Sequence, residues 1–438
     1  MKQLLFAWAL FASGSVYCQE FNRQKMDSLF TLIEDHQQGM GSISIFSDGQ
    51  EVYQRAFGFA SIEDKVKATP GTKYRIGSIS KTFTAAIIMQ LVEEGKLELD
   101  TRLSTYYPDI KYADEITIEQ LLRHRSGIFN FTSAPDYPSW MEQSITQEEL
   151  VRKIEQYGSV FEPDAKYEYS NANYVLLSYI VERIDQKSFR EVLQERVCKP
   201  CALRNTYYGS AISVEDHEAN SYTNFGDWKL ATETHMSVPA GAGAIVANPT
   251  DLNKFLHCLF SATAVTEASL KQMTDLQDGY GLGMLQAPFY DKKAFGHTGG
   301  IDGFQSNAFY FPTEKVSVAY TSNGVVMPMN DILIGALSIY FGKDYDLADI
   351  TPALKLKPED LDQFLGVYSS PTFPVKLTIT KNGNVLIGQG SGQPEFRLEA
   401  VTPTTFRFDP AQLEIEFFPN EARLILQQGG GTFELNKE

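Results

Sequence analysis

The spacing of apolar residues changes along the chain and divides it into segments with different predicted structure. Residues 43–46 and 52–60 are two short apolar runs on either side of Ser47-Asp48-Gly49-Gln50. An Asp-Gly pair between two such runs is typical of a β-hairpin. Residues 82–94 are rich in Ala, Ile and Leu, contain no Gly or Pro, and are followed by Gly95. We expect a helix over this segment, ended by the glycine.

Three other segments have the features of helices. Thr117 and Gln120 form a capping-box pattern, and we expect the helix that follows them to end at Gly127. Residues 173–184 carry apolar side chains at helical spacing. Residues 332–341 are almost entirely apolar and are predicted to form a closing helix.

Two strand-like runs lie near the far end of this helical region, at residues 308–311 and 316–320, separated by Pro312-Thr313-Glu314. Strands at both ends with helices between them indicate an α/β domain whose sheet is completed by segments distant in sequence. We place this domain at residues 19–343.

The character of the chain changes after Asp344. Residues 344–358 have weak periodicity and are predicted to be a linker, and residues 359–438 are predicted to form a small all-β domain. Asn382-Gly383 has the composition of a type I′ hairpin turn. The predicted strands of this domain are residues 375–380, 385–387, 405–408, 413–417 and 424–427. The domain contains no histidine and no cysteine, so we expect it to bind, pack or cover rather than to do chemistry.

The N-terminus has the features of an export signal over residues 1–18. Lys2 supplies a positive charge and residues 4–11 are an apolar run of the length of a signal-peptide core. We expect cleavage after Cys18 and a periplasmic or secreted protein. The alternative is a lipid anchor on Cys18, which the bulky neighbour Tyr17 disfavours. No later run approaches about 18 consecutive apolar residues, so no transmembrane segment is predicted.

Composition and charge limit the partners. The chain has 438 residues with 43% hydrophobic and 21% charged residues, as in ordinary globular proteins. Its formal net charge of −17 repels phosphate backbones and anionic lipids, which argues against nucleic acid or a membrane surface as a partner. A substrate attracted by charge would be neutral or cationic, or held by a local positive site.

Cysteine usage gives a weak signal. Cys198 and Cys201 have the spacing of a redox motif but follow a helix-like segment, Phe189 to Arg196, rather than a strand. A structural disulfide between them, or two buried thiols, is the favoured interpretation. Cys258 is most simply a core residue.

The chemistry begins with Ser78 and Lys81, three residues apart at the start of the predicted helix 82–94. Residues at this spacing lie on the same helix face, so the lysine amine can reach the serine hydroxyl. A serine needs a neighbouring base to become a nucleophile, and a helix N-terminus offers N–H groups to an oxyanion. Taken alone, this pair is better explained by a helix cap with an exposed lysine.

A second element is Tyr169-Ser170-Asn171, directly before the predicted helix 173–184. A tyrosine beside a serine and a lysine can relay a proton, and an asparagine amide can contact substrate and lysine. The same pattern occurs in Tyr222-Thr223-Asn224. We prefer Tyr169 because the helix that follows would fix its position.

The third element is His297-Thr298-Gly299-Gly300, before the strand-like residues 304–311. Its glycines allow a substrate backbone to approach closely. A histidine here could hold a substrate carboxylate, and the Gly300 N–H could complete an oxyanion hole. The alternative is a histidine in a glycine-rich hairpin.

The order of these three elements resembles the serine β-lactamases and penicillin-recognising enzymes, in particular the branch of class C β-lactamases, DD-carboxypeptidases and esterases. The resemblance extends to residues 74–83, 116–127, 240–243 and 280–283, and it covers residues 39–342. It implies an α/β (α+β) serine β-lactamase-like fold: an antiparallel sheet flanked by helices, with an all-helical lobe between early and late strands. The tail resembles the barrel-like extensions of some members.

The resemblance also implies the catalytic roles. Ser78 would be the nucleophile, Lys81 its proton partner and Tyr169 the general acid and base. It implies no cofactor and no metal, and the six histidines form no recognisable zinc motif.

The remaining motif residues would bind substrate. Asn171, Thr298 and Gly299 would contact it, His297 would face its anionic end, and the backbone N–H groups of Ser78 and Gly300 would form the oxyanion hole. His124, in the matched stretch 116–127, is expected to be structural.

One departure bears on the substrate. β-Lactamases of this branch typically carry lysine where His297 stands, and histidine is mostly uncharged near neutral pH. We therefore rank a DD-peptidase or esterase above a class C-like β-lactamase. Small peptide, amide, ester and β-lactam substrates all stay open. A non-catalytic penicillin-binding sensor or scaffold is a further alternative, as is a tail domain that associates with the cell wall.

Overall fold

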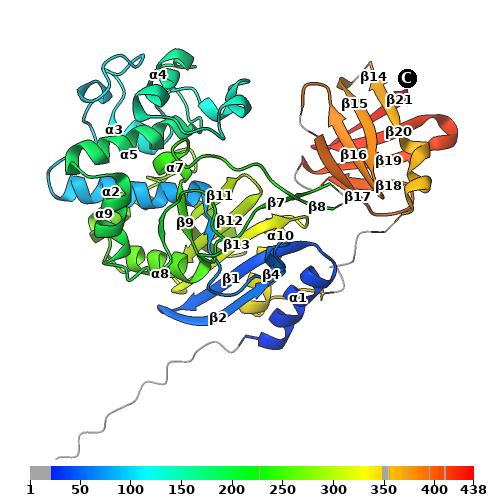
Figure 1. Ribbon diagram of the computed structural model, residues 1–438, viewed down its shortest axis with the longest axis horizontal. Helices are drawn as coiled ribbons and strands as arrows, with labels where there is room; N and C mark the ends of the chain where they lie inside the picture. Colours follow the sequence, from blue (N-terminus) through cyan, green and yellow to red (C-terminus); the bar gives the residue numbers. More distant parts are fainter. Residues whose placement is uncertain are drawn as a thin grey trace, which may run out of the picture.

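The structure is a computed structural model, and it describes residues 21–438 apart from 226, 348–353, 355, 372, 394, 409 and 410. A six-stranded antiparallel sheet forms its centre (Figure 1). The strands lie in the order β10 (Leu285–Phe289), β11 (Lys292–Ile301), β12 (Phe304–Phe311), β13 (Val316–Val325), β1 (Gly39–Ser47) and β2 (Gln50–Phe57). The hairpin predicted around Asp48-Gly49 is β1–β2, and its neighbour β13 comes from the far end of the domain.

The side chains of the central strands point alternately to the two faces of the sheet and so contribute to two separate hydrophobic cores. Phe309 and Phe311 of β12 pack with α1 (Arg23–Asp35) and α10 (Met329–Tyr340) on one face of the sheet. Ala308 and Tyr310 point the opposite way, toward α8 and the helical lobe. Successive side chains of a strand point to opposite faces, so one strand serves both cores.

The helical lobe lies between the early and late strands of the sheet. The helices that follow β2 in the chain are α2 (Ser80–Glu93), α3 (Ile118–Leu122), α4 (Gln147–Tyr157), α5 (Asn171–Asp185), α6 (Phe189–Leu193), α7 (Ala240–Gly243), α8 (Pro249–Phe260) and α9 (Glu267–Thr274). Short strands complete the domain: β3 (Phe59–Ser61), β4 (Val66–Lys67), β5 (Tyr74–Arg75), β6 (Tyr207–Tyr208), β7 (Tyr222–Asn224), β8 (Trp228–Leu230) and β9 (Ile245–Ala247). The fold implied by the resemblance is therefore observed.

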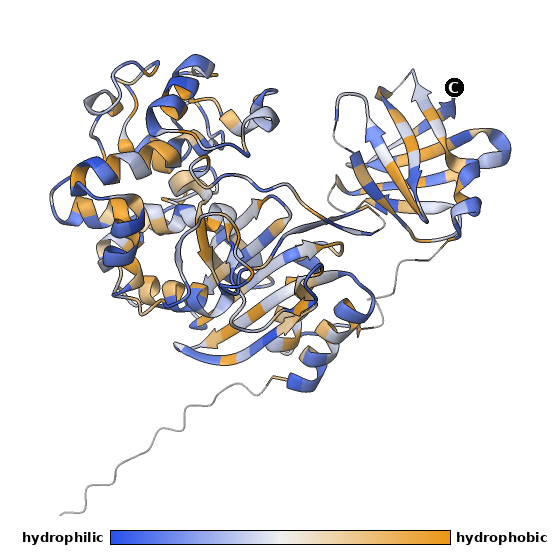
Figure 2. Ribbon diagram, viewed as in Figure 1, coloured by the Kyte–Doolittle hydropathy of each residue, from blue (hydrophilic) through white to orange (hydrophobic). Residues whose placement is uncertain are grey.

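The C-terminal region is a closed eight-stranded barrel. Its strands are β14 (Gly366–Ser370), β15 (Phe373–Asn382), β16 (Val385–Gly390), β17 (Glu395–Ala400), β18 (Thr405–Phe408), β19 (Leu413–Phe418), β20 (Arg423–Gln428) and β21 (Gly431–Lys437). Apolar and polar residues alternate along them, as the banding in Figure 2 shows, and the apolar ones fill the barrel. The predicted linker at residues 344–358 lies partly outside the described residues, and the predicted boundaries of the domains remain predictions.

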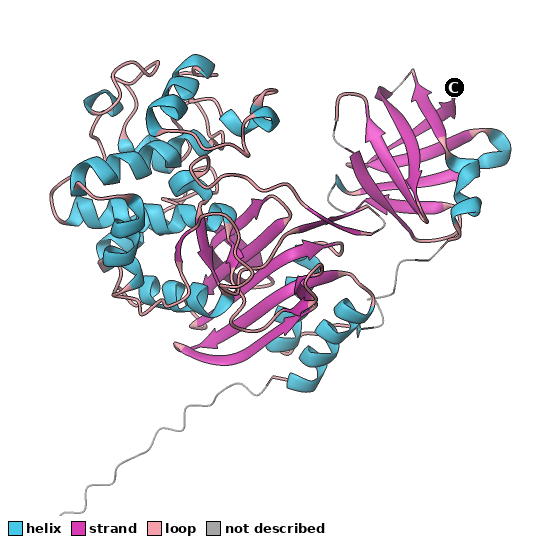
Figure 3. Cartoon of the chain, in the orientation of Figure 1, coloured by secondary structure: helices cyan, strands magenta, loops and turns pink. Residues whose placement is uncertain are grey.

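Figure 3 shows most of the helices gathered around the central sheet, and apart from it a barrel of strands with short helical turns at its side. The β7–β8 hairpin extends from the hydrolase part toward the barrel (Figure 1). None of the helices among the described residues is long and apolar enough to cross a lipid bilayer. The predicted export signal at residues 1–18 lies outside the described residues.

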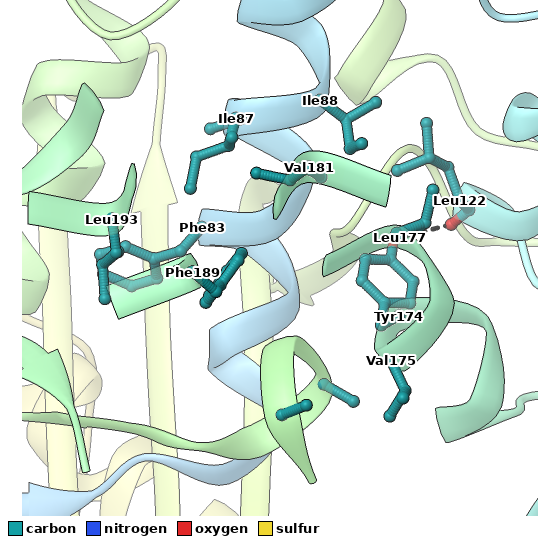
Figure 4. Close-up of a cluster of buried hydrophobic side chains, with 14 of the residues drawn as sticks. Phe83, Ile87, Ile88, Leu122, Tyr174, Val175, Leu177, Val181, Phe189 and Leu193 are labelled. Carbon is teal, nitrogen blue, oxygen red and sulfur yellow. Dashed lines mark hydrogen bonds between the residues drawn. The ribbon is translucent and has the colours of Figure 1, made fainter. Parts of the chain in front are cut away.

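Helix α2 positions the catalytic motif, and it is buried on nearly every side. Phe83, Ile87 and Ile88 pack among side chains of α5 and α6, including Val181 and Phe189 (Figure 4). A helix that is apolar all round can only be stable inside a core. The N-terminal end of α2 is therefore fixed relative to the helices and to the sheet.

Two predictions from the sequence are wrong. The helix begun by the Thr117 capping box ends at Leu122, not at Gly127, because Arg123 leaves helical geometry and His124 adopts a φ of 56°. Gly127 instead serves a turn in which a Cβ atom would lie 2.2 Å from the carbonyl oxygen of Phe161.

The cysteine interpretation is also wrong. Cys201 forms a disulfide with Cys258 on α8, and Cys198 is a free, buried thiol. Cys198 Sγ donates to the Thr206 carbonyl oxygen at 3.4 Å, and burial raises the pKa of its thiol to about 12. The disulfide closes a loop of 57 residues, a pairing that local spacing could not reveal.

Candidate active site

Ser78 lies in the short 3₁₀ turn Gly77–Ile79 that leads directly into α2. Gly77 has a φ of 51°, and a Cβ atom on it would lie 2.8 Å from the backbone nitrogen of Gly300. Only glycine accepts both the conformation and the close approach. The turn therefore brings Ser78 beside the end of β11, where the sequence placed the other oxyanion-hole residue.

Lys81 lies in the first turn of α2 and is completely buried. Its Nζ atom lies 2.9 Å from Ser78 Oγ, 2.8 Å from Asn171 Oδ1 and 2.8 Å from the Ala242 carbonyl oxygen. None of these partners is a carboxylate. Burial alone lowers the pKa of the Lys81 amine well below its usual value. The neutral amine has a lone pair and can accept the proton of the Ser78 hydroxyl.

The contact with Ala242 depends on the small residues of α7. A Cβ atom on Gly241 would lie 2.4 Å from Ser178 Cβ, and the Gly241 carbonyl oxygen accepts a bond from Thr84 Oγ1 at 2.7 Å. The helix can thus approach α2 and α5 closely enough for Ala242 to reach Lys81. The sequence marked residues 240–243 as a family stretch, but not this role.

Asn171, the first residue of α5, is held on both sides. Its Oδ1 atom accepts from Lys81, and its Nδ2 atom donates to Asn130 Oδ1 and Thr132 Oγ1, each at 3.2 Å. Asn130 Oδ1 also accepts from the Asn171 backbone N–H at 3.0 Å. Asn171 therefore orients Lys81. Sequence reasoning missed Asn130 and Thr132, which carry no motif.

Tyr169 lies against Lys81, with the lysine nitrogen 4.9 Å from the ring centroid. Burial raises the pKa of its hydroxyl, while a hydrogen bond with Ser78 opposes that shift. The phenol is therefore protonated and suited to donate a proton. The competing Tyr222 lies elsewhere, with its hydroxyl bonded to Glu63 Oε2 at 2.5 Å. Of the two Tyr-x-Asn motifs, the structure brings only the first to Lys81.

His124 holds the turn between Tyr169 and Asn171. Its ring is fully buried, 4.2 Å from the Tyr169 ring between centroids, and its Nδ1 atom accepts from the Ser170 backbone N–H at 3.2 Å. Burial lowers the pKa of the His124 ring well below its usual value, and the nearby Lys81 adds to the shift. His124 is therefore a neutral, buried side chain that packs against Tyr169.

The structure brings the His297 ring beside Tyr169, with 6.3 Å between the ring centroids, and buries it. The His297 ring is 3% exposed, with Nδ1 2.5 Å from the Thr298 carbonyl oxygen and Nε2 3.0 Å from the Tyr280 hydroxyl. A carbonyl oxygen only accepts, so Nδ1 carries the hydrogen and Nε2 accepts from Tyr280. Burial is the main cause that lowers the pKa of His297, to about 3. A neutral ring with both nitrogens engaged cannot face the anionic end of a substrate.

The end of β11 provides an open edge. Strand β10 pairs with β11 only as far as Gly296, so Thr298, Gly299 and Gly300 have no neighbour strand on that side. A Cβ atom on Gly299 would lie 2.0 Å from the Ile76 carbonyl oxygen, which requires glycine there. Thr298 and Gly300 are exposed. The structure thus brings Gly300 to the Ser78 turn and leaves its edge free for a substrate.

A pocket of about 570 Å³ opens in front of Ser78. Asn171 and Gly300 line it, and so does an apolar wall. That wall comprises Phe131, Tyr137, Met141, Leu230 and Pro239. No lysine or arginine is among the described residues that line the pocket, and its one acidic residue, Asp302, is bonded to Arg75 at 2.9 Å. The pocket therefore has an apolar wall and a carboxylate that is already paired.

Comparisons with known proteins agree with this geometry. The model of the beta-lactamase family matches residues 24–336. Penicillin-binding protein 4* of Bacillus subtilis is 24% identical, over 90% of this chain and 93% of its own length. Teichoic acid D-alanine hydrolase of Staphylococcus aureus is 27% identical. The match covers 49% of this chain and 53% of that protein, about half of its length. The crystal structure of D-amino acid amidase from Ochrobactrum anthropi SV3 superposes with a TM-score of 0.65 and 25% identity, covering 73% of this chain and 99% of the amidase.

Proposed function

Because this chain belongs to the beta-lactamase family, we propose that it is an exported serine hydrolase that cleaves amides or esters through an acyl-enzyme on Ser78. The observation that carries the proposal is the 2.9 Å contact between Lys81 Nζ and Ser78 Oγ, made by a buried lysine without a carboxylate partner. The chain is a serine hydrolase, as are its relatives that act on D-alanine esters and D-amino acid amides.

Acylation follows from the geometry. Ser78 Oγ attacks the substrate carbonyl carbon while its proton passes to the neutral Lys81 amine. The backbone N–H groups of Ser78 and Gly300 hold the oxyanion, aided by the positive end of the α2 dipole. The carbon–leaving-group bond then breaks, and the leaving group takes the proton of the Tyr169 hydroxyl. Tyr169 recovers a proton from the Lys81 ammonium.

Deacylation repeats these steps with water. A water molecule gives a proton to the Lys81–Tyr169 pair and attacks the acyl carbon, and Ser78 Oγ leaves with a proton. Asn171 keeps Lys81 aligned throughout, because its Oδ1 atom is itself fixed through the Asn130 and Thr132 contacts.

The pocket favours a peptidase or esterase over a β-lactamase. The carboxylate of a β-lactam needs a cation, and the described residues lining the pocket include no lysine or arginine. His297 does not replace such a cation, because its ring is neutral and buried. A neutral acyl group fits the apolar wall of the pocket better, because the carboxylate of Asp302 is paired with Arg75.

The test compares the wild-type protein with Ser78→Ala and with Ser28→Ala, a half-buried serine on α1, as the matched control. Each is assayed with a p-nitrophenyl ester, a D-Ala-D-Ala peptide and a chromogenic cephalosporin. We expect Ser28→Ala to behave as wild type and Ser78→Ala to lose at least about 10³-fold in turnover. Mass spectrometry should find the acyl group on Ser78.

Each contrary outcome removes a specific part of the proposal. Full activity of Ser78→Ala shows that Ser78 is not the nucleophile. Rapid turnover of the cephalosporin places a β-lactamase above a peptidase or esterase. Covalent labelling by penicillin without any turnover favours the sensor.

Export is part of the proposal and rests on the predicted signal at residues 1–18. Fractionation of the full chain and of a chain lacking residues 2–18 tests it, since only the full chain should leave the cytoplasm. Cys18→Ser distinguishes cleavage from lipid anchoring. A soluble exported protein is unaffected by this change, whereas an anchored one is released from the membrane fraction.

A further inference from the structure

A second groove adjoins the catalytic pocket. It has a volume of about 870 Å³ and lies between the hydrolase part and the barrel. Its walls are the end of β11, the turn into β12, the segment from β13 into α10, strand β7, and barrel strands β17 and β18. The groove and the catalytic pocket share Thr223, Gly300, Ile301 and Asp302. A substrate whose carbonyl lies at Ser78 can therefore continue past Gly300 into the groove.

The barrel wall of the groove contains Arg397, which has an unusual set of partners. Its guanidinium donates to Asn224 Oδ1 on β7, and its Nε atom is buried without a hydrogen-bond partner among the described residues. Burial lowers the pKa of Arg397. The charge of the Glu399 carboxylate, two residues along β17, opposes that shift. A buried guanidinium Nε–H without a hydrogen-bond partner is costly, and the cost is recovered when an anion accepts from it.

The neighbours of Arg397 make the groove amphipathic. Glu399 of β17 lies opposite Arg407 of β18, so both face the groove with Arg397, and they approach each other to 3.9 Å. Phe396 and Phe408 stack at 4.8 Å between ring centroids on the same wall. The opposite wall is formed by Val325, Val326 and Met327. Such a surface fits a chain that carries apolar groups and one anionic group.

We propose that this groove binds the leaving-group side of the substrate, and that Arg397 recognises a carboxylate or phosphate on it. The inference rests on the proposed function, because it extends the same site. The catalytic pocket, which opens in front of Ser78 and has an apolar wall, takes the acyl side. The two pockets share Gly300, so a leaving group on the carbonyl held there can enter the groove.

The experiment uses esters of one acyl group with three leaving groups: glycerol 3-phosphate, lactate and glycerol. Phosphate and carboxylate are thus compared with a neutral alcohol. The proteins are wild type, Arg397→Gln, Asn224→Asp and Arg423→Gln. Arg423, on β20, pairs with Glu421 and does not line the groove, so its replacement changes the net charge equally. Asn224→Asp leaves Arg397 in place but gives it a carboxylate partner of its own.

We expect wild type to prefer an anionic over the neutral leaving group in kcat/KM by about tenfold or more, as a charge-assisted hydrogen bond provides. Arg397→Gln and Asn224→Asp should both lose this preference and keep glycerol ester turnover, while Arg423→Gln keeps the preference. Whether the phosphate or the lactate ester is preferred identifies the anion. The carboxylate introduced by Asn224→Asp can still accept a hydrogen bond from Arg397 on the barrel. A loss of preference in this variant therefore does not come from a displaced barrel.

The inference is overturned if wild type has no preference, or if Arg397→Gln and Arg423→Gln behave alike. Failure of the proposed function gives a different result. In that case neither the wild type nor any variant hydrolyses the neutral p-nitrophenyl ester. If the wild type hydrolyses that ester but shows no preference for an anionic leaving group, the hydrolase function stands and only the role of Arg397 is refuted.

Discussion

Two buried cations on either side of the Ser78 turn have opposite surroundings. Arg75, on β5, is 2% exposed and contacts two carboxylates, Asp302 and Glu233, and two backbone carbonyl oxygens. Lys81, at the start of α2, is fully buried and contacts only the neutral oxygens of Ser78, Asn171 and Ala242. The region around Arg75 thus neutralises its cation, and the region around Lys81 does not.

The difference assigns the two regions different tasks. A guanidinium cannot lose its proton in a protein, so a buried arginine needs carboxylates and forms a structural junction. A buried lysine without them is stable as the neutral amine, which is the form of a general base. Within eight residues of chain the same fold thus holds a permanent cation and a proton acceptor. Three substitutions test whether carboxylate contact decides this, and a fourth tests the histidine packed behind Tyr169.

Lys81→Arg should have the largest effect. It gives the Lys81 region a permanent cation and removes the base, so we expect kcat/KM for an ester to fall by about 10³-fold or more. Lys81→Met removes the base without adding charge and is the control, expected to lose as much activity while folding normally. Retention of a tenth of the activity by Lys81→Arg would contradict a base at this position.

Asp302→Asn tests the other region, through stability. Removing one partner of a buried ion pair leaves an uncompensated charge, and we expect a loss of about 3 kcal/mol in the free energy of unfolding, since Glu233 remains. Asp48→Asn, which removes an exposed pair with Lys315, should cost less than about 1 kcal/mol. Denaturant unfolding is followed by tryptophan fluorescence, because Trp140 and Trp228 lie in the hydrolase part and the barrel has no tryptophan.

A loss for Asp302→Asn no larger than that for Asp48→Asn would show that the Arg75 region does not need its carboxylates. A second variant, Arg75→Met with Asp302→Leu, removes both charges. It should recover part of the loss, because apolar replacement of a buried pair avoids the desolvation cost.

Asn171→Asp should make the Lys81 region resemble the Arg75 region. A carboxylate 2.8 Å from Nζ favours the ammonium and should raise the pKa of Lys81. The neutral amine is the active form, so activity rises with pH through this pKa. The acidic limb of the kcat/KM profile should therefore move to higher pH, with activity lost at pH 7 and regained above it.

Thr132→Val is the matched control for Asn171→Asp. It removes a hydrogen-bond partner of Asn171 without adding charge, so it should lower activity and leave the acidic limb in place. If both variants shift the limb equally, then displacement of Asn171, and not charge, sets the pKa of Lys81.

The sequence predicted well what depends on neighbouring residues. The Asp48-Gly49 hairpin, the helix over residues 173–184 and the barrel strand at 405–408 are set by local periodicity and turn residues, and each is observed. The spacing of Ser78 and Lys81 fixed their contact for the same reason, since both lie within one helical turn.

What the sequence did not reveal depends on segments that meet in space. Asn130 and Ala242 complete the surroundings of Asn171 and Lys81 from distant loops and helices. His297 lies in a motif, but whether its ring faces the cleft depends on Tyr280, which engages it from a separate segment. The partner of Cys201 is on α8, fixed only by the packing of that helix. Motif reading gives candidates, and tertiary packing decides their orientation.

The smallest expected effect is that of replacing His124. This residue contacts the segment Tyr169-Ser170-Asn171, and through that segment it acts on Lys81. His124→Phe keeps the ring but removes the acceptor for the Ser170 N–H, and an unsatisfied buried donor costs about 1–3 kcal/mol. We expect kcat to fall about tenfold with little change in KM, because the turn that holds Tyr169 and Asn171 loosens. His124→Asn, which tolerates the positive φ and can supply an acceptor oxygen, should retain more activity.

The choice of substrate separates a positioning role from general damage to the fold. A p-nitrophenolate leaves without a proton, whereas an alkoxide needs one from Tyr169. If His124 acts by holding Tyr169, His124→Phe loses more activity on an alkyl ester than on the p-nitrophenyl ester. Equal losses on both esters mean that the substitution only destabilises the domain. His124 would then have no part in holding Tyr169 beside Ser78.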